Sequence, residues 1–180
     1  MKATDLLEKQ HRKVEAIFAK LDGDDKQAGK RELVEELADN LAAHQAIEEK
    51  IFYPAVKKAL DEDGRMQVLE SFEEHALAKV GLMRLLATAV DEEPFQARVT
   101  ALKELIEHHV GEEEEDLFPD VEDAIDADEL VAMGTKMKEL FDATIAKGYA
   151  AAMAEDPMMK TPIAKPAKAN GVKQERTARR

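Results

Sequence analysis

Apolar side chains recur along this chain at intervals of three and four residues, the spacing that places them on one face of an α-helix. Five stretches show this pattern, at about residues 4–21, 30–60, 65–90, 95–118 and 128–154. No segment alternates apolar and polar residues over a useful length, so no β-strand is expected. The pattern therefore predicts an all-α protein.

Short polar segments connect the first four stretches, and short connections place consecutive helices side by side in opposite directions. We therefore expect an up-down-up-down four-helix bundle over residues 1–122. A further C-terminal helix within residues 123–155 would pack on the bundle, and residues 156–180 would form a disordered basic tail. Pro54 lies inside the second stretch, so a bend is expected just past Glu48.

Composition narrows the functional classes. The chain of 180 residues has a net charge of −13, but residues 160–180 hold seven Lys or Arg and one Glu, so the remainder carries 19 basic and 38 acidic residues. A body this acidic disfavours nucleic acid and anionic lipid. The chain has no Cys, which excludes thiolate metal sites, and no apolar run long enough for a membrane span. A cytoplasmic protein is the expectation.

Four of the five histidines belong to a duplicated pattern. His11 is followed 33 residues later by His44, and Glu48 stands four positions beyond. His75 is followed 34 residues later by His109, and Glu113 again stands four positions beyond. Each copy ends with a proline ten residues after its second histidine, so the two halves are related helical hairpins.

The duplicated residues have the chemistry of a metal site. In a helix, residues four apart share a face, so each His-x-x-x-Glu pair points together toward the apolar interior. Two buried carboxylates side by side repel one another unless cations neutralise them. Nitrogen and oxygen donors without thiolate suit iron above manganese, zinc or copper. The candidate ligands are His11, His44, Glu48, His75, His109 and Glu113.

This repeat, with Phe-Tyr-Pro and Leu-Phe-Pro after the two glutamates, resembles the hemerythrin-like (HHE cation-binding) domain over about residues 3–120. The resemblance implies a centre of two non-haem iron ions, bridged by Glu48, Glu113 and an oxo or hydroxo group. One position departs from the oxygen-carrying hemerythrins. They have a His-x-x-x-His pattern on the third helix, whereas the residue four after His75 is Lys79. The departure favours redox chemistry or sensing over oxygen storage.

Three further features are interpreted from their neighbours. Tyr53 follows Phe52 at the expected bend, and packing is favoured over a role at the centre because its counterpart is Phe118. His108 points about 100° away from His109 and is expected at the surface. Within the acidic run 112–116, only Glu113 has a histidine one turn earlier, so the other members are interpreted as a solvated face.

Three functions remain open on this evidence. The first is a di-iron protein that binds or reacts with O2, NO or H2O2 in sensing, detoxification or stress response. The second is an iron storage or donation protein without turnover, and the third is an interaction module stabilised by metal. The sequence leaves open whether the protein is an enzyme and what its oligomeric state is.

Overall fold

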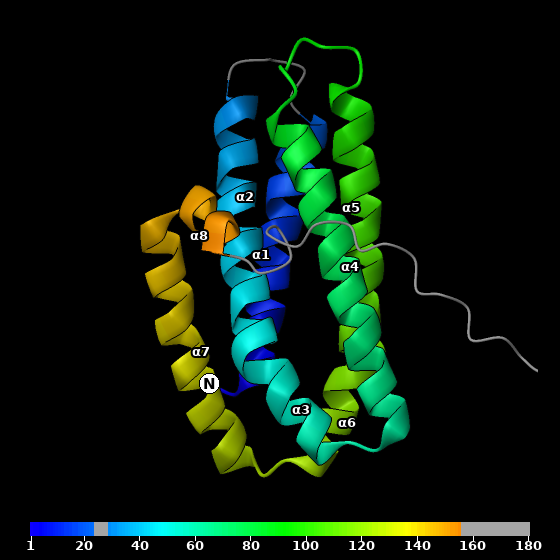
Figure 1. Cartoon of the computed structure of the whole chain (residues 1–180), viewed down its shortest axis with the longest axis vertical. Coiled ribbons are helices and arrows are strands. Elements are labelled where there is room, and N and C mark those ends of the chain that lie inside the picture. Colours follow the sequence, from blue (N-terminus) through cyan, green and yellow to red (C-terminus); the bar gives the residue numbers. More distant parts are fainter. Residues whose placement is uncertain (24–28, 156–180) are drawn as a thin grey trace, which may run out of the picture.

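The four helical stretches expected from the sequence form an antiparallel up-down-up-down bundle (Figure 1). The computed structural model describes residues 1–23 and 29–155, so the expected tail over 156–180 lies outside the described residues. Every regular element in these two ranges is helical. The elements are α1 (Ala3–Gly23), α2 (Lys30–Ile47), η1 (Glu48–Phe52), α3 (Tyr53–Ala59), α4 (Glu62–Leu86), α5 (Phe95–Glu112), η2 (Glu113–Leu117), α6 (Phe118–Ala124), α7 (Ala127–Lys147) and α8 (Tyr149–Glu155).

The bend expected near Pro54 takes the form of a π-helical turn. Segments η1 and η2 are single π-turns that continue α2 into α3 and α5 into α6. The N–H group of Tyr53 donates to the carbonyl oxygen of Glu48, five residues earlier, and Phe118 bonds Glu113 in the same way. Pro54 then occupies the first turn of α3, where a missing N–H is tolerated. The chain therefore keeps its helical course through both prolines.

Two apolar clusters divide the core along the bundle axis. One cluster occupies the half of the bundle that contains Phe18, Leu37 and Leu102, and the other contains Leu7, Phe52 and Leu117. On α1 the boundary between them falls at His11, between Leu7 and Val14. The same change occurs at the histidines of α2 and α4 and just past the histidine of α5, between Val110 and Leu117, so the core is interrupted by one polar layer.

Helices α7 and α8 pack outside the bundle, against the first hairpin (Figure 1). Helix α7 buries Leu130, Met133 and Met137 in the core cluster around Leu7. A Cβ atom on Gly134 would lie 2.6 Å from the carbonyl oxygen of Met1, so glycine permits the N-terminus to approach α7.

The single C-terminal helix expected from the sequence is divided in two. Gly148 has a φ of 79°, a left-handed conformation that favours glycine and ends α7. The N–H group of Tyr149 then donates to Oδ1 of Asp39 at 2.7 Å, which fixes the start of α8 against α2.

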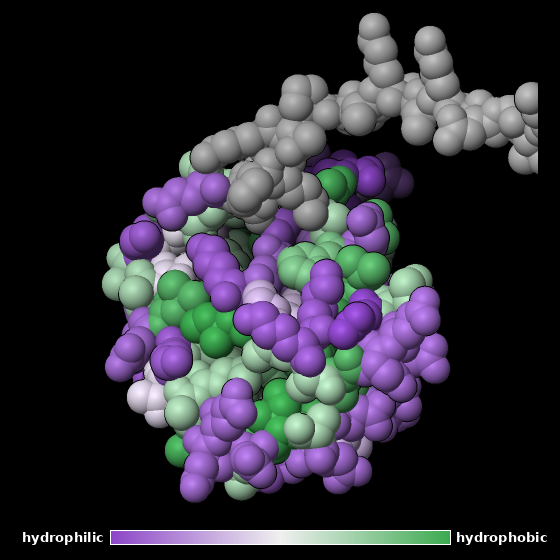
Figure 2. All heavy atoms as spheres, turned by 60° about the horizontal axis from the view of Figure 1, so that its bottom comes forward, coloured by the Kyte–Doolittle hydropathy of each residue, from purple (hydrophilic) through white to green (hydrophobic). Residues whose placement is uncertain are grey.

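Hydrophilic side chains are distributed around the α3–α6 end of the bundle, with hydrophobic ones between them (Figure 2). None of the described helices is long and apolar enough to cross a membrane.

Candidate metal centre

The polar layer consists of the six side chains that the duplicated pattern identified. Helices α1, α2, α4 and α5 each direct one histidine inward, and the two π-turns begin with the two glutamates. None of the six is more than 5% exposed. The structure therefore brings together all of the residues expected to bind metal: His11, His44, Glu48, His75, His109 and Glu113.

The six side chains form two groups of donors around the bundle axis. His11 and His44 approach within 3.2 Å between their Nε2 atoms, and His75 and His109 within 3.1 Å. The Glu48 carboxylate lies between the groups, with Oε1 at 3.1 Å from Nε2 of His44 and Oε2 at 3.3 Å from Nε2 of His75. Two sets of ligand atoms lie within 4.8 Å of one another: His11, His44, Glu48 and Glu113 in the first, and Glu48, His75 and His109 in the second.

The second carboxylate joins the groups from the opposite hairpin. Oε2 of Glu113 lies 3.3 Å from Nε2 of His11 and 3.8 Å from Nε2 of His109. Glu48 thus contacts His44 of its own hairpin and His75 of the other, and Glu113 contacts His109 of its own hairpin and His11 of the other. The arrangement follows the internal repeat, because each glutamate contacts one histidine from each hairpin.

Each of the four imidazoles is held in place through its Nδ1 atom. Nδ1 of His11 lies 2.7 Å from Oε1 of Glu114, and Nδ1 of His75 lies 3.0 Å from Oε1 of Glu49. The same atom of His44 and of His109 lies 2.9 Å from Oε1 of Gln10 and 2.8 Å from Oε2 of Glu74, respectively. All four partners present acceptor oxygens, so each Nδ1 carries a proton and each Nε2 atom faces the centre of the layer.

These orienting partners repeat with the ligand pattern. Gln10 and Glu74 immediately precede the first histidine of each copy, and Glu49 and Glu114 immediately follow the glutamate. The interpretation of Glu114 as part of a solvated face was therefore wrong. Its carboxylate bonds His11 and also pairs with the guanidinium of Arg12. Partners of this kind fix the orientation of metal-bound imidazoles and typically contribute 10–100-fold to metal affinity.

The inner surface of the layer fits a cation and little else. Four Nε2 lone pairs converge with carboxylate oxygens at 3.1–3.8 Å. Both oxygens of Glu48 and Oε2 of Glu113 are buried, and no described residue donates a hydrogen bond to them. Lone pairs and carboxylates this close repel one another unless protons or metal ions lie between them. The residues present therefore fit metal ions with nitrogen and oxygen ligands.

In the metal-free protein, protons on the histidines partly neutralise the buried carboxylates, and this raises the pKa values of three of the imidazoles. Burial disfavours the charged form of His109, but the carboxylates of Glu113, Glu74 and Glu48 outweigh burial and raise its pKa to about 9. The pKa values of His11 and His75 are also raised by their carboxylate neighbours against the effect of burial. Burial dominates at His44 and lowers its pKa. For Glu48, the imidazoles of His44 and His75 outweigh burial and lower the pKa well below 4.5.

Tyr53 packs in the core, as expected, and its hydroxyl also reaches the centre. Its hydroxyl donates to Oε1 of Glu113 at 2.8 Å and lies 3.4 Å from Nε2 of His75. In an undisturbed α-helix, Tyr53 would lie about 140° around the axis from Glu48, and the wider π-turn reduces this angle. Burial and the carboxylates of Glu113 and Glu48 raise the pKa of Tyr53 well above 10, so the hydroxyl remains a donor.

Replacing Tyr53 with Phe should destabilise the metal-free protein by about 1–3 kcal/mol, because Oε1 of Glu113 loses its buried donor. Urea unfolding of metal-free protein measures this change in the free energy of unfolding. The matched control is Tyr149→Phe, which removes the hydroxyl of the other tyrosine at a half-buried site and should change stability by less than about 0.5 kcal/mol. Equal stability of Y53F and the unsubstituted protein would contradict the role assigned to this hydrogen bond.

Lys79 lies one turn after His75 on α4. Its side chain is 7% exposed, and Nζ lies 2.8 Å from Oε1 of Glu49. Glu49 in turn accepts from Nδ1 of His75. The Lys79 ammonium group therefore supports the orientation of His75 from behind the ring.

A small cavity faces the four imidazoles. Its volume is about 10 Å³, enough for one molecule of about the size of water. Aliphatic side chains form most of the remaining wall: Val14, Leu41, Ile106 and Val110. A molecule in this cavity would contact the four imidazole rings and would otherwise be surrounded mostly by aliphatic side chains.

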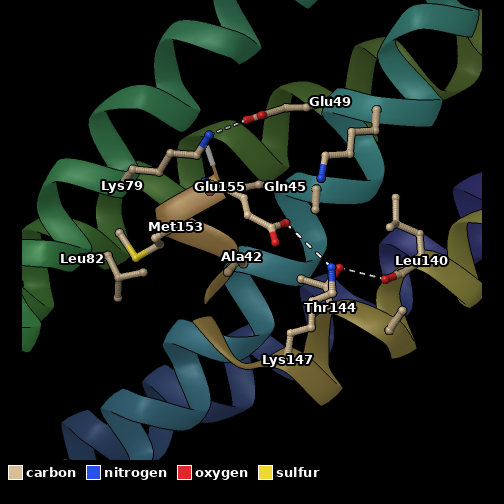
Figure 3. A pocket seen from close by; sticks show the side chains of 14 residues that line it. Ala42, Gln45, Glu49, Lys79, Leu82, Leu140, Thr144, Lys147, Met153 and Glu155 are labelled. Atoms are coloured by element: carbon tan, nitrogen blue, oxygen red, sulfur yellow. Dashed lines mark hydrogen bonds and ion pairs between the residues drawn. The ribbon is translucent and has the colours of Figure 1, made fainter. Parts of the chain in front are cut away.

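A larger pocket of about 110 Å³ lies between α2, α4, α7 and α8, with the Glu49–Lys79 ion pair on one wall (Figure 3). Gln45 lines both this pocket and the small inner cavity. The opposite wall carries Lys147 and Glu155, which form an ion pair at 3.7 Å. The C-terminal helices thus cover the side of the bundle that lies behind His75.

The fold and the site define a helical-bundle protein with a cation-binding centre built from two related hairpins. The family model of hemerythrin, described as the HHE cation-binding domain, matches residues 2–121, and the chain belongs to this family. A solved structure supports the same fold. It is a hemerythrin HHE cation-binding domain-containing protein from Mycobacterium kansasii, with a TM-score of 0.71 and 24% identity, covering 82% of this chain and 89% of the other.

Two curated proteins are also similar in sequence. A DNA nickase of Nostoc is 25% identical over 138 residues, which is 77% of this chain and 38% of the relative. An uncharacterized hemerythrin-like protein of Schizosaccharomyces pombe is 24% identical over 135 residues, which is 75% of this chain and 66% of the relative. The chain thus spans less than two thirds of the length of each.

Proposed function

We propose that this chain is a non-haem di-iron protein that binds or reacts with O2, NO or H2O2 in sensing, detoxification or stress response. The observation that carries the proposal is the convergence of six buried donors, with unpartnered carboxylate oxygens, beside a cavity of about 10 Å³. His11 and His44 would hold one ion, and His75 and His109 the other, with Glu48 and Glu113 shared between them. The cytoplasmic location expected from the sequence stays a prediction.

Bound iron would supply Lewis acidity and a change of oxidation state at this position. The protein residues have separate tasks around it. The Nδ1 hydrogen bonds fix the imidazole rings, and the aliphatic side chains of the small cavity limit water. The Tyr53 hydroxyl donates a hydrogen bond to Glu113 and thereby reduces the negative charge at Oε1. Six donor residues are fewer than two octahedral ions use, so positions remain for a small ligand.

Metal analysis combined with spectroscopy tests this function. Anaerobic loading with Fe2+ should give about two iron ions per chain, as expected for two groups of nitrogen and oxygen donors. Exposure to air or addition of azide should then produce a visible charge-transfer band. Retention of fewer than two ions, or two ions with an unchanged spectrum after every small ligand, would contradict the proposal.

Storage or donation of iron is the second candidate, because the acidic net charge of −13 attracts cations to the protein surface. Rapid loss of both ions to a weak chelator, without oxygen evolution from added peroxide, would favour this role. Nicking of DNA is not proposed. The relative with that name is much longer, and the acidic body of this chain repels the phosphate backbone.

A further inference from the structure

A second group of metal-binding side chains lies on the outer surface of the hairpin formed by α4 and α5. Glu74, His108 and Glu112 place three ligand atoms within 4.8 Å of one another. Nε2 of His108 lies 3.2 Å from Oε1 of Glu112 and 3.6 Å from Oε1 of Glu74. His108 and Glu112 have the same four-residue spacing as the inner pairs, one position earlier along the helix.

This outer group is both accessible and connected to the centre. The side chain of His108 is 64% exposed, as expected from the sequence, so a hydrated ion can reach it. Glu74 divides its two oxygens between the groups. Oε1 faces His108, and Oε2 accepts the hydrogen bond from Nδ1 of His109. One carboxylate therefore contacts an outer imidazole and an inner one.

An acidic pocket leads inward from the same place. A pocket of about 80 Å³ lies between α4 and η2, and Glu112 of the outer group forms part of its wall. Glu70 and Asp116 add two more carboxylates, and no Lys or Arg of residues 1–23 and 29–155 lines it. The pocket ends on Glu113, which is 1% exposed and has an unpartnered Oε2 atom. A cation in this pocket would meet carboxylates from the surface to the centre.

In the part of the chain that the structure describes, the first hairpin has no equivalent of this route. In the internal repeat, Glu74 and Glu70 correspond to Gln10 and Leu6. The positions of His108, Glu112 and Asp116 are taken by Ala43, Ile47 and Ile51. Helix α7 packs against this side, which explains the apolar residues. The two sides of the centre therefore differ, and the open side carries the cation-binding groups.

We propose that Glu74, His108 and Glu112 form an outer divalent-metal site that captures Fe2+ and delivers it through the acidic pocket to Glu113. The inference rests on the proposed function, because it supplies the centre with its metal. One nitrogen and two carboxylate oxygens suit first-row divalent ions, and exposure of the site keeps binding weak enough for onward transfer.

Binding of Co2+ to the metal-free protein tests the outer site directly. The unsubstituted protein should bind a third, weaker ion in addition to two tight ones, with a paramagnetic shift of the His108 imidazole signal in NMR spectra. The His108→Ala/Glu112→Gln double variant should bind only the two tight ions. A third ion of unchanged affinity in the double variant, or no third ion in the unsubstituted protein, would overturn the assignment.

The rate at which Co2+ enters the centre tests delivery. Visible absorption follows this rate after rapid mixing, and the double variant should load about tenfold more slowly than the unsubstituted protein while reaching the same two-ion occupancy. Glu73→Gln is the matched control, since it removes one exposed negative charge from the same face but no ligand. Its loading rate should stay within about twofold, as expected for loss of one exposed charge among many.

The outcomes separate this inference from the proposed function. Two-ion occupancy with equal rates in all three proteins overturns delivery through the outer site and leaves the function intact. Equal slowing in Glu73→Gln and the double variant also overturns it, because surface charge alone would then explain the rate. Absence of two-ion occupancy in the unsubstituted protein overturns both.

Discussion

Replacing His109 with alanine should reduce the iron content from about two ions per chain to one or fewer. His109 supplies one of the two imidazoles in its donor group, with its Nε2 atom 3.1 Å from that of His75. Its loss leaves the second ion with a single histidine and the shared carboxylates. Losing an orienting partner typically costs 10–100-fold in metal affinity, so losing the ligand itself should cost at least about 100-fold. Metal analysis after gel filtration measures the occupancy.

The neighbouring histidine provides the control for this experiment. His108→Ala removes an imidazole from the adjacent position on the same helix, but its side chain is 64% exposed and points away from the centre. At equilibrium it should retain two iron ions, whatever its loading rate. Two tightly bound ions in His109→Ala would show that His109 is not a ligand.

The sequence predicted that the six candidate side chains lie together in one buried layer, because the required signals are local and repeated. A histidine and a glutamate four residues apart share a helix face in any register of the bundle. Two copies of the hairpin then place these faces opposite one another across an apolar core. For the same reason, the all-α architecture and the antiparallel order of the first four helices were confirmed by the structure.

The orienting residues were missed because their sequence neighbours look like an ordinary solvated surface. Glu49 and Glu114 belong to charged stretches, and only the packing of opposite hairpins brings them to His75 and His11. The repeat contained the missing signal, since each of these glutamates directly follows a candidate ligand. Comparing every position of the two copies, and not only the histidines, would have identified them.

Backbone irregularities account for the remaining differences. The position of Tyr53 depends on the π-turn, which no periodicity in the sequence predicted. The proline that suggested a bend was the only local sign of it. Gly148 lies inside an amphipathic pattern that predicted one continuous helix, but its positive φ divides the C-terminal segment into α7 and α8. In both cases, one residue changes the direction of side chains that an ideal helix would place elsewhere.

Removal of metal should produce a protein whose stability falls as the pH rises from about 6.5 to 9. In the metal-free protein, His109 has a pKa of about 9 against an ordinary value of 6.5, so the folded state binds a proton that the unfolded state has lost. This contribution to stability is complete below pH 6.5 and is lost as the pH rises through 9. The interval corresponds to about 3 kcal/mol if His109 titrates alone, and the raised pKa values of His11 and His75 act in the same direction.

Bound metal should abolish this alkaline loss, because the ions replace the protons between the imidazoles and the carboxylates. Stabilisation by metal should therefore increase across the same pH range, as protons cease to compete for the Nε2 atoms. Urea unfolding of metal-free and metal-loaded protein at a series of pH values measures both curves. Metal-free His109→Gln is the control and should have a shallower slope. A metal-free protein as stable at pH 9 as at pH 6.5 would show that protons do not neutralise the buried carboxylates, and the electrostatic argument for a cation at this layer would lose its basis.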